Sequence, residues 1–150
     1  MDIRTEIKKM PVGNGIYARM AMERVASRLI KATEQSEEAK KEVLYSLPGI
    51  FAVEIRSGAN SVRLIKEGDV FREMESSEKS DILLVVIFQD QGAETAYLSG
   101  AASLARLYAE GRLSSRGRGK YRNAFMRIAR VADETVLSKK KLRAMYGSER

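Results

Sequence analysis

Few side chains in this sequence have the types and spacing that acid–base or nucleophilic chemistry requires. The 150 residues include neither histidine nor cysteine, which excludes Ser-His-Asp and Cys-His catalysis, disulfides, and zinc sites built from those ligands. Glu73 and Glu75 fall on one side of an expected strand, where an exposed sheet edge explains them. Asp133 and Glu134 are adjacent and point apart on an expected helix. We therefore expect neither catalysis nor a bound metal ion.

Two glycine-containing segments match phosphate-binding motifs only in part. Residues 13–18 fit the letters of the dinucleotide fingerprint, but no strand precedes them, and that motif requires a strand–turn–helix context. Residues 117–120 end as a phosphate-binding loop does, yet Ser114 stands where the first glycine belongs. Tyr121 also replaces the small hydroxyl residue that would hold Mg²⁺. We therefore expect no cofactor.

The basic residues are concentrated in the last third of the chain. Residues 1–100 hold 14 basic and 16 acidic side chains, whereas residues 101–150 hold 13 basic and 4 acidic ones, for a net charge of +7. Such a cluster attracts polyanions: nucleic-acid backbone, an anionic lipid surface or an acidic partner. The alternative is a solvated face that keeps the protein soluble. The residues assigned to this anionic-partner patch are Arg112, Arg116, Arg118, Lys120, Arg122, Lys139, Lys140 and Lys141.

The elements that would position a site are clearest between residues 80 and 117. Ile82–Phe88 is a run of seven apolar residues, too short to span a membrane, and it predicts a strand that is covered on both faces. Apolar residues then recur at helical spacing from Ala93 to Glu110, which predicts one amphipathic helix. Gly111 ends that helix, and a short strand follows over Leu113–Gly117.

The preceding part of the chain changes from helical to alternating periodicity. Phe51, Val53 and Ile55 alternate with less apolar residues, which predicts a half-buried strand. Turn residues separate it from two further strands, over residues 61–65 and 70–74. We therefore predict an α+β fold: a mostly antiparallel sheet of about five strands with helices packed on one face. The strand at Ile82 is expected to be central.

The chain divides into three expected parts. Residues 1–36 form a polar leader and a helix with an apolar stripe from Ala18 to Ala32, through which an oligomer could form. Residues 37–137 form the main domain, and residues 138–150 form a short basic helix. The first ten residues lack an apolar stretch of signal-peptide length, so we expect a cytoplasmic protein.

Several of these features together resemble a known family. Asp81, the strand Ile82–Phe88, Gly100 and the segment from Tyr108 to Leu113, closed by Gly117, resemble the sterol-carrier-protein-type lipid-binding module. The resemblance implies a non-catalytic carrier of an apolar small molecule, either a fatty acyl chain or a sterol-like lipid. It also implies that the ligand occupies a tunnel between the sheet and the helices.

The resemblance extends over about residues 37–137. The chain departs from the family pattern at Ser114-Ser115 and in the basic segment 118–122, both near the expected mouth of the tunnel. Pockets for such ligands have mostly apolar walls, although the same residues could instead make a filled core. The expected wall residues are Phe51, Val53, Ile55, Leu84, Val86, Phe88, Tyr97, Leu104, Leu107, Tyr108, Phe125 and Met126.

Overall fold

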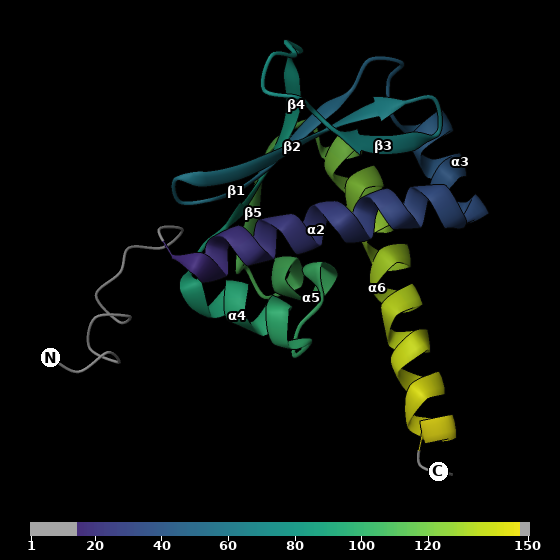
Figure 1. The fold of residues 1–150 in the computed structure, drawn as a ribbon. Helices are drawn as coiled ribbons and strands as arrows, with labels where there is room; N and C mark the ends of the chain where they lie inside the picture. The colour runs from purple at the N-terminus through teal and green to yellow at the C-terminus, as the bar shows by residue number, and fades with distance from the viewer. Residues whose placement is uncertain (1–14, 148–150) are drawn as a thin grey trace, which may run out of the picture.

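A five-stranded sheet with helices on one face forms the centre of the computed structural model (Figure 1). The structure describes the backbone of residues 15–147 and the side chains of residues 15–134. Its elements, in chain order, are α2 (Ile16–Gln35), α3 (Glu37–Ser46), β1 (Ala52–Ser57), β2 (Asn60–Glu67), β3 (Val70–Glu73), β4 (Ile82–Phe88), α4 (Gln91–Ser99), α5 (Leu104–Ala109), β5 (Leu113–Gly117) and α6 (Gly119–Gly147).

The strand order confirms the predicted α+β class, with one difference in position. The sheet runs β3-β2-β1-β4-β5. The β1–β2, β2–β3 and β4–β5 pairs are antiparallel, and β1–β4 is parallel. The middle strand is therefore β1, and β4 is its interior neighbour rather than the central strand. The β1–β2–β3 meander extends from one side of β1 only, which leaves the other side for β4 and then β5.

The expectation that β4 is covered on both faces is wrong for the part of the chain that the structure describes. Leu84, Val86 and Phe88 are buried on the face that meets the helices. Val85 and Ile87, on the opposite face, are only half-buried, and the described helices lie on the other face of the sheet (Figure 1). The described helices therefore cover only one face of this apolar run.

The predicted single helix from Ala93 to Glu110 is two helices. Gly100, with φ of +80°, ends α4 in the left-handed conformation, which glycine adopts without the steric penalty of a Cβ. Ser103 begins α5 by accepting a hydrogen bond from the Arg106 amide at 3.1 Å. The periodic pattern continues through the break because both helices place their apolar residues toward the same core.

A single hydrophobic cluster contains residues from both the first and the second of the expected parts of the chain. Ser36 caps α3 by accepting a hydrogen bond from the Ala39 amide at 3.2 Å, so residue 36 marks a turn between two helices. The apolar residues of α2 from Ala21 to Ala32 lie in the same hydrophobic cluster as the strands. The short basic helix expected from residue 138 continues α6, because no glycine or proline interrupts residues 120–146.

Candidate ligand-binding site

The sheet contributes six of the expected wall residues to one buried surface. Phe51, Val53 and Ile55 project from β1 or immediately before it, and the register pairs Val53 with Leu84 and Ile55 with Val86. Because alternate residues of paired strands share a face, these side chains form a continuous apolar layer. Each of the six residues, which also include Phe88, is at most 2% exposed.

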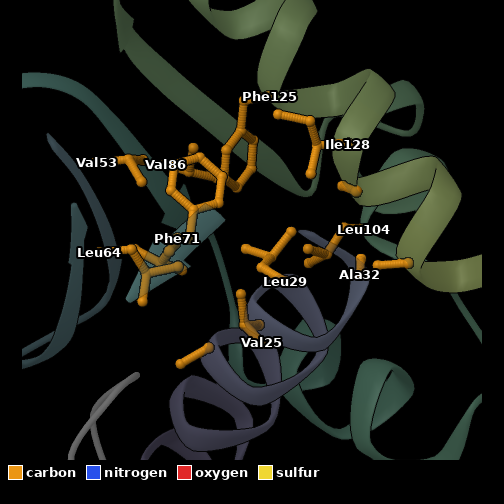
Figure 2. Packing of buried hydrophobic residues seen from close by; sticks show 14 of the residues in the cluster. Val25, Leu29, Ala32, Val53, Leu64, Phe71, Val86, Leu104, Phe125 and Ile128 are labelled. Atoms are coloured by element: carbon orange, nitrogen blue, oxygen red, sulfur yellow. The ribbon is translucent and has the colours of Figure 1, made fainter. Parts of the chain in front are cut away.

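The helices contribute the opposite side of this layer. Tyr97 of α4, Leu104 and Leu107 of α5, and Phe125 of α6 are buried. Tyr108 and Met126 are half-buried and pack against the same cluster. Figure 2 shows Phe125, Ile128 and Leu104 lying opposite Val53, Val86 and Phe71. The twelve expected wall residues therefore lie in or against one apolar cluster; that they line a cavity stays a prediction.

Sequence reasoning left out several residues of this cluster. Val25 and Leu29 of α2 lie at its centre, close to the side chains contributed by α6 and the sheet (Figure 2). Their helical spacing is visible in the sequence, which predicts an apolar stripe but does not indicate what that stripe contacts. The buried face of α2 is therefore occupied by this chain's own core. Its exposed apolar residues are instead Ile16, Tyr17 and Met20.

A small group of polar side chains borders the cluster. The Arg28 guanidinium carbon lies 4.9 Å from the centre of the Tyr97 ring, and that ring packs edge-on against Phe88 with 6.2 Å between centroids. Burial raises the pKa of Tyr97 to about 12, although the Arg28 charge acts in the opposite direction. Tyr97 therefore stays neutral at physiological pH and offers a hydroxyl within a largely apolar region.

Asp133 of α6 belongs to the same group and has a carboxyl oxygen with no hydrogen-bond partner among the described residues. It is 8% exposed, and its Oδ2 atom is buried without a hydrogen-bond partner among the described residues. Burial raises the pKa of Asp133 to about 6, against the opposing effects of Arg28 and of the backbone amides of Leu104 and Ala105. The carboxyl group thus has one oxygen that could accept or, when protonated, donate a further hydrogen bond.

A second buried carboxyl group lies at the carboxyl end of β1. The Ser57 hydroxyl donates a hydrogen bond to the Glu94 carboxylate of α4, and both residues are almost fully buried. Burial, and secondarily the Asp90 carboxylate, raises the pKa of Glu94. Ser57 and Glu94 satisfy one another, so this pair joins β1 to α4.

The described surface also has two open grooves, and none of the twelve expected wall residues lines either. One, of about 350 Å³, lies between α2 and α4 and is mainly apolar. The other, of about 480 Å³, lies beside the β3–β4 connection and is polar. The first is lined by Tyr17, Met20, Arg24, Thr95, Leu98 and Ser99, and the second by Arg63, Glu78, Lys79, Ser80 and Asp81.

The residues of the anionic-partner patch have different environments. Arg112 bonds to Asp90 at 3.2 Å, and its neighbour Asp90 caps α4 through the Ala93 amide, so Arg112 has a structural role. The Arg122 guanidinium carbon lies 5.9 Å from the centre of the Tyr108 ring. Arg116, Arg118 and Lys120 are exposed where β5 meets α6. The side chains of Lys139, Lys140 and Lys141 lie outside the described residues.

Two kinds of feature are absent from the described part of the chain. Among its residues, no group of three or more acidic side chains is arranged to hold a metal ion. None of its helices combines the length and the apolar character needed to cross a bilayer.

Comparisons with known proteins match the fold at low identity. No protein-family model matches this sequence, and no curated protein is significantly similar to it. Sterol carrier protein-like domains recur among the similar solved structures. Sterol carrier protein 2 like 2 from Aedes aegypti is 12% identical with a TM-score of 0.47, over 73% of this chain and 96% of that one.

Two further solved structures show how widely the proteins that match differ. The ubiquinone synthesis protein UbiJ-SCP2 is 18% identical with a TM-score of 0.48, over 83% of this chain and 97% of that one. The sec-alkylsulfatase Pisa1 from Pseudomonas sp. is 12% identical with a TM-score of 0.45, over 77% of this chain but only 17% of the enzyme.

Proposed function

We propose that this protein is a non-catalytic carrier of an apolar small molecule, a fatty acyl chain or a sterol-like lipid. The ligand would occupy a tunnel between the sheet and the helices. One observation supports the proposal. The expected wall residues come from distant segments of the chain, mainly β1, β4, α4, α5 and α6, and they lie together in or against one apolar cluster. Carrier sites of this kind need mostly apolar walls with a few polar anchors.

The polar group beside the cluster would anchor the polar end of the ligand. Arg28 offers hydrogen-bond donors, and the unpartnered Asp133 Oδ2 offers an acceptor. Tyr97 adds a neutral hydroxyl close to Arg28. A buried acceptor without a partner is costly, so a ligand that supplies a donor there would recover a hydrogen bond. A hydroxyl or carboxylic acid headgroup has the required chemistry.

Replacing Leu104 with tryptophan tests whether the predicted tunnel exists. Leu104 is 2% exposed within the expected wall, so Leu104→Trp should fill the tunnel and reduce binding of a fluorescent fatty acid without unfolding the protein. Leu98→Trp is the matched control, because Leu98 is half-buried at the edge of the cluster and also lines the groove between α2 and α4. Normal binding by Leu104→Trp, with stability reduced by roughly 1–3 kcal/mol, would show overpacking of a filled core.

A second candidate function is binding to nucleic acid or another anionic surface. Arg116, Arg118 and Lys120 favour it, since all three are exposed and none forms an ion pair among the described side chains. Added salt separates the two candidates. Binding to phosphates weakens steeply with salt concentration, whereas burial of an apolar chain changes little.

The proposed carrier has no catalytic step of its own. The sequence lacks the histidine and cysteine that most often act as general base and nucleophile. Ser57 and Glu94, the one buried hydroxyl–carboxylate pair described, are almost fully buried. Reproducible turnover of an acyl ester that a single point substitution abolishes would contradict this part of the proposal.

A further inference from the structure

The face of the sheet opposite the helices has an unusual composition, and we call it the outer sheet face. One row across four strands consists of Arg63, Glu54, Val85 and Arg116, in that order. In the next row, Ile87 is paired with Arg56 on one side and with Ser114 on the other. The outer sheet face is defined here as Glu54, Arg56, Arg63, Val85, Ile87, Ser114 and Arg116.

The apolar residues of the outer sheet face lack a cover in the described part of the chain. A strand with one face in water normally alternates apolar and polar residues, whereas continuous apolar runs are typical of strands covered on both faces. β4 has the continuous pattern, yet Val85 and Ile87 are half-buried and the described helices lie on the other face of the sheet (Figure 1). The composition of β4 therefore fits a strand whose second face is covered by another molecule.

The charges around these apolar residues are mainly positive. Glu54 is only 4% exposed, and its carboxylate contacts Arg56 at 2.8 Å and Arg63 at 3.5 Å. One carboxylate thus serves two guanidinium groups, each of which keeps unused donors. Arg116, across Val85 from Glu54, is exposed and forms no ion pair among the described side chains. The outer sheet face is therefore an apolar centre with a net positive surround.

We propose that the outer sheet face binds an amphipathic segment of a partner protein, with apolar side chains flanked by aspartate or glutamate. The apolar side chains would cover Val85 and Ile87, and the flanking carboxylates would pair with Arg56, Arg63 and Arg116. Opposite charges on the two surfaces would orient the segment and exclude unsuitable partners. This inference goes beyond the carrier function and does not depend on it, because none of its residues belongs to the predicted tunnel wall.

The same observations disfavour other occupants. A second copy of the chain packed face to face would oppose arginine with arginine. Residues 1–14 hold three basic and two acidic side chains, so they lack the complementary charge. Single-stranded nucleic acid stacks on aromatic rings, and the outer sheet face has aliphatic residues at its centre instead.

A designed peptide tests this proposal. The probe is a synthetic amphipathic helix with leucine along one side and glutamate on both flanks, and its counterpart has lysine in place of glutamate. We expect the glutamate peptide to bind at micromolar to millimolar concentration and to shift the amide NMR signals of β1, β2, β4 and β5. The lysine peptide should not bind, and added salt should weaken the complex.

Three variants locate the binding surface. Arg116→Glu should weaken binding of the glutamate peptide by about tenfold or more, since it opposes like charges. Val85→Thr should weaken it by about threefold, since it replaces an apolar methyl group with a hydroxyl. Arg130→Glu is the matched control on exposed α6 and should change affinity by less than about twofold.

Several results would overturn the proposal. These are absence of binding at millimolar glutamate peptide, amide shifts confined to the helices, or equal effects of Arg116→Glu and Arg130→Glu. A dimer in sedimentation experiments that Arg116→Glu abolishes would assign the outer sheet face to a second copy. Shifts of the same amides by single-stranded DNA or anionic vesicles, with none from the peptide, would assign it to those partners. None of these results tests the carrier function, which is tested separately by measuring fatty-acid binding.

Discussion

The two faces of β4 have nearly the same composition but very different surroundings. Leu84, Val86 and Phe88 point toward the helices and are at most 2% exposed, whereas Val85 and Ile87 point away and are half-buried. The inner residues meet apolar neighbours from α2, α5 and α6 (Figure 2). The outer ones lie among Glu54 and three arginines. The apolar composition of a strand face therefore indicates that the face is to be covered, and the residues around that face indicate the chemistry of the cover.

The buried carboxyl groups on the two sides of the sheet differ in the same way. Glu54, on the outer side, has two arginine partners. Asp133, on the helix side, keeps one buried oxygen without a partner among the described residues. On the outer side, the positive charge of the arginines therefore exceeds the negative charge of Glu54. On the inner side, one carboxyl oxygen of Asp133 lacks a hydrogen-bond partner among the described residues. This contrast underlies our two proposals, an acidic partner for the outer sheet face and a ligand headgroup beside the inner cluster.

The largest expected effect is on the inner side. Phe125→Ala removes a side chain that is 0% exposed between α6 and the sheet, and such truncations destabilise a protein by about 3–5 kcal/mol. Urea unfolding followed by circular dichroism would measure the change in free energy of unfolding. A loss below about 1 kcal/mol would show that this side chain is not tightly packed and would weaken the contrast between the faces.

The second effect concerns the pH dependence of stability. Folding raises the pKa of Asp133 from an ordinary 3.8 to about 6, so the folded protein keeps a proton that the unfolded chain has released. Its contribution to stability is therefore present at about pH 4 and is lost as pH rises through 6, by on the order of 2 kcal/mol. Asp133→Asn should lack this decrease, as measured by urea unfolding across the same range.

Glu134→Gln provides the control for this measurement. Glu134 neighbours Asp133 in α6 but is exposed, so its substitution should leave the decrease between pH 4 and 6 intact. If wild type and Asp133→Asn lose stability in parallel over this range, then Asp133 does not cause the decrease. Its carboxyl group would then lie in a more polar environment than its burial indicates.

A smaller effect distinguishes one long helix from two short ones above the inner face. In a continuous helix, Gly100→Ala would stabilise the protein by roughly 1 kcal/mol. Because Gly100 has φ of +80°, we expect the opposite sign, a loss of about 1 kcal/mol. Thermal unfolding of Gly100→Ala measures whether stability rises or falls. A raised melting temperature would indicate one continuous helix over residues 93–110.

The smallest effect is expected on the outer sheet face. Val85→Thr retains a β-branched side chain on a half-buried position, where water can reach the new hydroxyl. The free energy of unfolding should therefore fall by less than about 1 kcal/mol, as measured by urea unfolding. A loss comparable to that of Phe125→Ala would mean that this face is packed as tightly as the inner one.

Much of the fold could be predicted because local chemistry determines it. The alternation of apolar with less apolar residues predicts β1, and the turn residues after it predict the boundaries between β1, β2 and β3. Gly111, with φ of +75°, ended the helical pattern as expected. At Gly117 a Cβ would lie 2.5 Å from the Leu83 carbonyl oxygen, which gives a packing reason for a glycine that the sequence showed only as part of a motif.

The remainder depends on contacts between distant segments, which periodicity does not report. The position of β1 between β2 and β4 is set by pairing across the sheet. The break at Gly100 was hidden because α4 and α5 direct their apolar residues to one core. The group formed by Arg28, Tyr97 and Asp133 joins residues from α2, α4 and α6, and no short motif marks it. The grouping of Arg56 and Arg63 with Arg116 likewise follows only from strand register.

Native mass spectrometry of the purified protein tests the carrier function most directly. We expect a species heavier than the bare chain by the mass of one fatty acyl or sterol-like molecule, either as purified or after incubation with a fatty acid. Leu104→Trp should reduce that species, and Leu98→Trp should leave it unchanged. Only the bare-chain mass for the wild-type protein, even after incubation with excess lipid, would contradict the proposal that an apolar ligand occupies the space between sheet and helices.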